Sequence, residues 1–166
     1  MKKGIILQGS SRSVGNTSKI VEVLQQVTGF TVVDLKQKNI GHFDYDFKNQ
    51  DDDFMPLMRD IADNYEVILF VTPVYWYSMS SIMKAFFDRI TDCLKIEKST
   101  GRKLRGKSMG VISSSEDPDI VAGFDMPFRE SAGYLGMTYL GHLHTWVENG
   151  TVPNEVKAAM LDFFKD

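Results

Sequence analysis

The 166-residue sequence contains only one cysteine, only three histidines and no long apolar run. Cys93 alone cannot form an intramolecular disulfide, which excludes a disulfide framework. With 19 basic and 22 acidic residues, the net charge of −3 does not favour binding to nucleic acid. Because no stretch approaches the roughly 18 apolar residues of a membrane span, we also expect no membrane partner.

The N-terminus has a basic start but only a three-residue apolar run, Ile5 to Leu7. Such a run is too short for the apolar region of a signal peptide. Since nothing else in the sequence demands export, we expect a cytoplasmic protein.

Length and composition predict a single globular domain spanning residues 1–166, with 43% apolar and 25% charged residues. Short apolar or β-branched runs predict five strands. These runs are Gly4–Gln8, Thr31–Leu35, Val67–Val71, Met109–Ser113 and Thr138–Val147.

Helical spacing of apolar residues separates these strands, with Asn16, Thr17 or Ser18 as the N-cap of the first helix and Gly29 as its end. Further helices are predicted near Phe54–Asn64, from Ile82 to Leu94, from Pro127 to Leu135 and after Pro153. Alternating strands and helices indicate a doubly wound, three-layer α/β fold with a parallel sheet, which we predict in the flavodoxin-like order 2-1-3-4-5. A ligand is then expected at the carboxyl ends of strands 1 and 3, where the strand order switches.

The loop after the first strand runs from Gly9 to Thr17 and contains three serines, an arginine and Gly15. Its hydroxyls and the free N–H groups of the following helix are typical of an anion site. The spacing of its glycines matches neither a P-loop nor the G-x-G-x-x-G dinucleotide pattern. The loop is therefore better suited to one terminal phosphate than to a pyrophosphate. An ordinary serine-rich turn is the alternative.

The loop after the third strand carries three consecutive aromatic residues, Tyr75, Trp76 and Tyr77. Aromatic side chains in a loop beside an anion site indicate a wall for a flat ring. Alternatively, these side chains cover the end of the sheet or face a partner subunit. The loop after the fourth strand, Ser113 to Asp119, is a weaker signal because serine, aspartate and proline are common in turns.

The two segments GSSRSVGNT and TPVYWYSMSSIMKAFFDR resemble the FMN-binding core of the NAD(P)H-dependent FMN reductase family of flavodoxin-like proteins. This resemblance implies bound FMN and NAD(P)H as electron donor. It also implies which residues hold the FMN phosphate: Ser10, Ser11, Arg12, Gly15, Asn16 and Thr17. Residues flanking the ring and ribityl chain would be Pro73, Val74, Tyr75, Trp76, Tyr77 and Ser78. By topology, Ser113, Ser114 and Ser115 would lie near the cofactor.

The sequence departs from parts of this family at two points. It has no cysteine before Cys93, which excludes the iron–sulfur cluster of some members, and its third loop lacks the glycine-rich pattern of others. The resemblance also implies a homodimer or higher oligomer, and exposed aromatic residues in the second loop would be costly on a monomer.

The function predicted is an FMN-dependent oxidoreductase that passes hydride from NAD(P)H to a small acceptor: a quinone, an azo or nitro compound, or free flavin. No side chain is required as a general acid, although Tyr75 and Tyr77 are possible proton donors. The alternative is a flavodoxin-type electron carrier, which docks on redox partner proteins by electrostatic attraction. The net charge of −3 is small for such a carrier, whereas the acidic segment Asp44–Asp53 could serve as its docking surface. A protein that keeps the fold but has lost flavin is a third hypothesis.

Other polar groups are expected to have structural roles. We interpret the segment Asp44–Asp53 and the basic run Lys95–Lys107 as solvated loops. His142 and His144 would share one face of the fifth strand as structural polar residues, and no metal site is predicted. Cys93 is expected in the core and not as a nucleophile.

Overall fold

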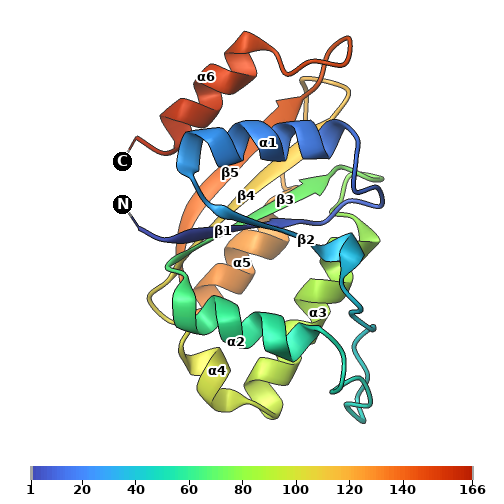
Figure 1. The fold of residues 1–166 in the computed structure, drawn as a ribbon, viewed down its shortest axis with the longest axis vertical. Helices are drawn as coiled ribbons and strands as arrows, with labels where there is room; N and C mark the ends of the chain where they lie inside the picture. The colour runs from blue at the N-terminus through green and yellow to red at the C-terminus, as the bar shows by residue number, and fades with distance from the viewer. Residues whose placement is uncertain (1, 166) are drawn as a thin grey trace.

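The computed structural model describes residues 2–165 and shows one parallel sheet between two layers of helices (Figure 1). The strand order is β2-β1-β3-β4-β5, as predicted. The strands are β1 (Gly4–Gln8), β2 (Thr31–Asp34), β3 (Val67–Pro73), β4 (Ser108–Ser115) and β5 (Thr138–Trp146). The helices are α1 (Asn16–Thr28), η1 (Leu35–Gln37), α2 (Phe54–Asn64), α3 (Ser81–Lys95), α4 (Lys98–Arg102), α5 (Met126–Leu135) and α6 (Asn154–Phe163).

The central strands divide their side chains between two cores because successive residues point to opposite faces. On one face, Ile6 and Leu69 pack in the core that includes α1 and α6; on the other, Leu7 and Phe70 pack in the core that includes α2, α3 and α5. Figure 1 shows α1 and α6 above the sheet and α2, α3 and α5 below it. Burial on both faces explains why the third strand is a continuous apolar run.

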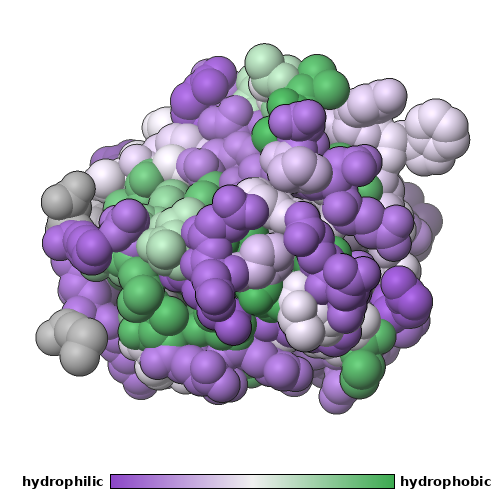
Figure 2. Space-filling view, turned by 90° about the horizontal axis from the view of Figure 1, so that it is seen from above, coloured by the Kyte–Doolittle hydropathy of each residue, from purple (hydrophilic) through white to green (hydrophobic). Residues whose placement is uncertain are grey.

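On the α1 and α6 side, hydrophobic groups are interspersed with hydrophilic ones (Figure 2). In residues 2–165, no helix is both long enough and apolar enough to cross a bilayer.

Several boundaries differ from the prediction. β4 extends to Ser115, so Ser113 and Ser114 are buried strand residues and not loop residues. The N-cap of α1 is Gly15, and not Asn16, Thr17 or Ser18. The predicted end of this helix is confirmed, since Gly29 follows it in the left-handed conformation with φ of 69°.

The basic run is solvated at most of its basic residues, as predicted, but it is not a loop throughout. Its middle forms α4, in which Thr100 and Gly101 are buried. Lys103 Nζ lies 2.6 Å from Asp63 Oδ1, and Lys107 donates to the backbone carbonyl of Tyr65. The segment therefore packs against α2 and the residue that follows it.

The prediction of a solvated acidic loop was wrong for Asp52, because this carboxylate binds a fully buried arginine of α3. Arg89 donates through Nη1 and Nη2 to Asp52 and through Nε to Asp92 Oδ2 at 2.7 Å. The guanidinium also donates to the carbonyls of Gly41 and Asn49. These bonds attach the long segment 38–53 to α3.

Burial by itself would raise the pKa of Asp52, but the hydrogen bond from Arg89 and those from the backbone N–H groups of Phe54 and Gly41 outweigh it. The pKa of Asp52 therefore lies below its ordinary value. Such a group stabilises the folded state above its unfolded pKa, and this stabilisation is lost as pH falls through the folded-state pKa.

We expect Asp52→Asn to lower the free energy of unfolding by about 3 kcal/mol at neutral pH, because it leaves the Arg89 charge buried with an incomplete partner set. The gap between wild type and variant should narrow as pH falls below about 4, because the carboxylate of the unfolded wild type is protonated first and that of the folded state, whose pKa is lower, only at still lower pH. Urea denaturation at several pH values measures both effects.

Asp88→Asn is the matched control, since Asp88 pairs with Lys84 in an exposed i,i+4 contact on the same helix. It should cost less than about 0.5 kcal/mol. Equal losses in the two variants would contradict the anchoring role of Asp52.

Candidate functional site

Three loops meet at the carboxyl edge of the sheet, after β1, β3 and β4. The first leaves β1 at Gly9, whose N–H donates to the Val71 carbonyl at 2.8 Å. A Cβ on Gly9 would lie 2.7 Å from Met83 Cε and 2.9 Å from Met83 Cβ. Only glycine therefore allows the first loop to pass this close to α3.

Ser80 connects this loop to the second one. Its hydroxyl donates to the Gly9 carbonyl at 2.5 Å and accepts from Met83 N at 3.1 Å, which caps α3. Its own N–H donates to Thr72 Oγ1 at 3.0 Å. Sequence reasoning missed Ser80 and Thr72 as site-building residues, although serine directly before a helical pattern is a recognisable N-cap signal.

The start of α1 offers unpaired donors to an anion. Within residues 2–165, no acceptor pairs with the backbone N–H groups of Asn16, Thr17 or Ser18, as expected for a first helical turn. The Ser18 hydroxyl closes the turn by accepting from Gly15 N at 3.0 Å and donating to Gly15 O at 2.9 Å. The guanidinium of Arg12 lies beside Gly15, within 3.8 Å of where a Cβ would stand.

The second loop ends in a tight turn from Tyr75 to Ser78, closed by backbone hydrogen bonds of 2.9 and 3.1 Å. Trp76 and Tyr77, its two central residues, have φ of 48° and 64°. Positive φ at both central positions defines a type I′ turn, which normally contains asparagine and glycine. Two bulky residues hold this strained conformation while their side chains are 93% and 71% exposed.

A further hydrogen bond joins the first and second loops. Ser11 Oγ and Tyr75 Oη lie 2.7 Å apart, although 64 residues separate them in sequence. The first loop and the aromatic turn are thereby held side by side.

The serines after the fourth strand have different environments. Ser113 Oγ lies 2.7 Å from both His142 Nε2 and His144 Nδ1, so its hydroxyl is bonded to two side chains of the neighbouring strand β5. Ser114 is buried and its carbonyl accepts from Val74 N at 2.9 Å. Ser115, half-buried at the strand end, bonds to the backbone of the following turn.

His142 and His144 do share one face of β5, as predicted. Burial lowers the pKa of His142, whose ring stacks near Phe124. In the part of the chain that the structure describes, no three histidine, cysteine or carboxylate side chains gather as a metal site would require. Cys93 lies in the core, as predicted, and burial raises the pKa of its thiol to about 12.

A groove of about 310 Å³ opens between the second and third loops. Its lining combines aromatic, aliphatic and acidic side chains: Val74, Trp76, Tyr77, Ser115, Asp117, Asp119, Ile120 and Val121.

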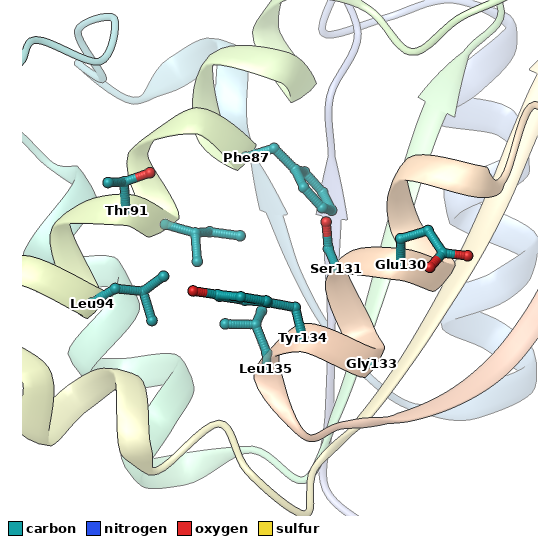
Figure 3. Close-up of a pocket in the computed structure, with 9 residues that line it drawn as sticks. Phe87, Thr91, Leu94, Glu130, Ser131, Gly133, Tyr134 and Leu135 are labelled. Carbon is teal, nitrogen blue, oxygen red and sulfur yellow. The ribbon is translucent and has the colours of Figure 1, made fainter.

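A larger cavity of about 660 Å³ lies between α3 and α5, where Phe87, Leu94 and Tyr134 form much of its wall (Figure 3). This cavity lies along the helices and is lined by none of the predicted cofactor-binding residues.

Solved structures share this architecture. A Bacillus subtilis protein described as Trp repressor binding protein has a TM-score of 0.78 at 21% identity, over 98% of each chain. General stress protein 14 of Treponema denticola, in complex with FMN, has a TM-score of 0.65 at 17% identity, over 97% of this chain and 95% of that one. The chain thus has the flavodoxin-like fold.

Sequence comparison defines the family. YwqN of Bacillus subtilis (strain 168), a candidate NAD(P)H-dependent FMN-containing oxidoreductase, is 26% identical over 150 residues, covering 83% of this chain and 81% of that protein. The profile of the NADPH-dependent FMN reductase family matches residues 1–152. The chain belongs to this family, and is therefore an oxidoreductase that uses FMN and NAD(P)H. This confirms the resemblance inferred from the first and second loops.

The turn at Trp76 and Tyr77 leads to a stability prediction. Replacing both residues to give Trp76→Asn/Tyr77→Gly should raise the free energy of unfolding of the apoprotein by about 1–2 kcal/mol, because it relieves the strain of two positive φ angles. Urea denaturation of the apoprotein measures this change.

The control is Trp76→Ala/Tyr77→Ala, which removes the rings but keeps side chains in the left-handed region. Should both double variants be equally stable, the turn would not be storing strain.

Proposed function

We propose that this protein passes hydride from NAD(P)H through bound FMN to a small planar acceptor: a quinone, an azo or nitro compound, or free flavin. The observation that carries the proposal is the hydrogen bond between Ser11 and Tyr75. It holds the loop that leads into the start of α1 beside the aromatic turn. A ligand with a phosphate at one end and a flat ring at the other suits this arrangement.

The residues of the first loop fit the FMN phosphate. The free N–H groups of Asn16 and Thr17 point from a helix N-terminus, where negative charge is stabilised. Arg12 offsets the phosphate charge, and the hydroxyls of Ser10 and Ser11 add donors. Gly15 gives the backbone room to approach the ligand.

The second and third loops would bound the ring. Pro73 and Val74 continue the end of β3, and the turn from Tyr75 to Ser78 rises beyond them. Ser115 lines the adjacent groove, whereas Ser113 and Ser114 support the strand beneath it. We therefore assign Ser113 and Ser114 to shaping this wall and Ser115 to facing the ligand.

The chemistry that FMN supplies when bound is hydride acceptance from NAD(P)H followed by reduction of the acceptor. The protein binds, orients and exposes the ring edge to small molecules. Two tyrosine hydroxyls are available to donate a proton to an acceptor. That of Tyr75 is positioned by Ser11, while Tyr77 is largely exposed to solvent.

The acidic segment gives the electron-carrier alternative less support than its sequence suggests. Asp52 is committed to Arg89, and Asp53 accepts from the backbone N–H of Asn39 at 2.7 Å. Asp46 pairs with Lys48 at 2.8 Å. Arg89 and Lys48 therefore offset part of the segment's negative charge, which weakens the electrostatic steering that a carrier would use to reach its partners.

We expect purified protein to retain added FMN through desalting, and the yellow colour to bleach rapidly when NADH or NADPH is added without oxygen. Arg12→Ala and Thr17→Ala should each weaken FMN by about 1–3 kcal/mol, the cost of losing a charge-assisted or buried hydrogen bond. Absorbance spectra and quenching of FMN fluorescence measure these outcomes.

Arg102→Ala is the control and should bind FMN like wild type, because α4 precedes β4 and so lies toward the opposite end of the sheet from the three loops. Unchanged affinity in both loop variants would show that the phosphate lies elsewhere. Colour that bleaches only with dithionite would instead favour an electron carrier.

We further propose that the exposed turn at Trp76 and Tyr77 meets a second copy of the chain, whose surface would complete the acceptor pocket. Light scattering should then report a homodimer or higher oligomer at micromolar concentration. Trp76→Ser should shift the equilibrium between oligomer and monomer toward the monomer. Tyr45→Ser is the control, since Tyr45 is also exposed but lies in the segment 38–53. A wild-type monomer with FMN bound would refute this proposal.

A further inference from the structure

A second groove opens at the same edge of the sheet, between η1 and the start of α3. Its volume is about 250 Å³. Its apolar lining comes from both elements and from the segment between β2 and α2: Leu35, Ile40, Ile82 and Ala85. A flat, weakly polar group fits such a surface.

The polar residues of this groove are largely basic: Lys36, Lys38 and His42, with Ser81 beside them. Neither lysine forms an ion pair within residues 2–165. The neighbouring carboxylate of Asp34 is occupied in capping η1, where it accepts from Lys36 N at 3.0 Å and from Gln37 Nε2 at 3.3 Å. The rim therefore presents two positive charges to a ligand.

The groove adjoins the elements of the proposed FMN site. Lys36 follows the end of β2, which pairs with β1, and β1 leads directly into the phosphate loop. Ser81 follows Ser80, whose hydroxyl donates to Gly9 at the start of that loop. Figure 1 shows the end of β2 beside the start of α3.

The two grooves at this edge differ in charge. Asp117 and Asp119 line the groove between the second and third loops, so that groove repels phosphate groups. Lys36 and Lys38 attract them. The basic run from Lys95 to Lys107 precedes β4 and so lies toward the opposite end of the sheet.

We propose that the groove at Lys36 and Lys38 binds the 2′-phosphoadenosine end of NADPH and selects NADPH over NADH. The apolar floor takes the adenine, and the lysines pair with the 2′-phosphate, the one group that distinguishes the two donors. This inference rests on the proposed function, because it concerns the electron donor of that site.

The test uses the FMN-loaded protein and 2′,5′-ADP, a fragment of NADPH that cannot transfer hydride. Calorimetry should show 2′,5′-ADP binding at least about tenfold more tightly than 5′-AMP to wild type. The variant Lys36→Gln/Lys38→Gln should lose about tenfold or more in affinity for 2′,5′-ADP and little for 5′-AMP. In steady-state assays, kcat/KM should fall to a similar extent for NADPH and stay unchanged for NADH.

Lys98→Gln is the matched control, an exposed lysine of α4 outside the groove. An equal loss in this variant, or no loss in the double variant, would overturn the proposal. So would inorganic phosphate binding as tightly as 2′,5′-ADP at the same ionic strength, since the groove would then be a simple anion site. Failure of both nucleotides to reduce the flavin would refute the proposed function instead, whereas the 2′,5′-ADP measurement does not depend on turnover.

Discussion

The hydrogen bonds of Ser80 hold together the parts of this molecule on which the site depends. A single buried residue donates to the carbonyl of Gly9, accepts from the first turn of α3 and is itself tied to Thr72 at the end of β3. Because all three contacts lie at the carboxyl edge of the sheet, the first loop and the aromatic loop start from fixed positions. The Ser11–Tyr75 bond then adds a second connection further from the sheet.

Helix α3 also holds the segment 38–53 in place, because its buried Arg89 forms hydrogen bonds to that segment. Removing a guanidinium from water is costly unless its donors are satisfied, and here two carboxylates and two carbonyls satisfy them. The same helix faces the groove at Lys36 and Lys38 through Ile82 and Ala85. Anchoring of the segment therefore also positions one wall of the proposed nucleotide groove.

The aromatic turn differs from these buried residues, whose polar groups are hydrogen-bonded, because its backbone is strained. Trp76 and Tyr77 adopt a backbone conformation that glycine or asparagine would adopt at lower cost, and their side chains face solvent. Strained residues that persist in a rigid surrounding are frequent at ligand sites. In the proposed function, the free energy stored in this turn keeps aromatic surface available for a flat ligand, an acceptor or a partner chain.

The sequence by itself determined the order of strands and helices, the α/β class and the positions of the first two loops, because apolar periodicity and turn residues are local signals. It also carried the family motif around Gly9–Thr17 and Thr72–Arg89. Only the tertiary structure decided that Asp52 pairs with Arg89 and that the Ser113 hydroxyl lies within hydrogen-bond distance of two histidines. It also decided that Lys36 and Lys38 border a groove. These features depend on residues far apart in the chain, and polar residues such as Ser113 resemble loop residues until the sheet provides their partners.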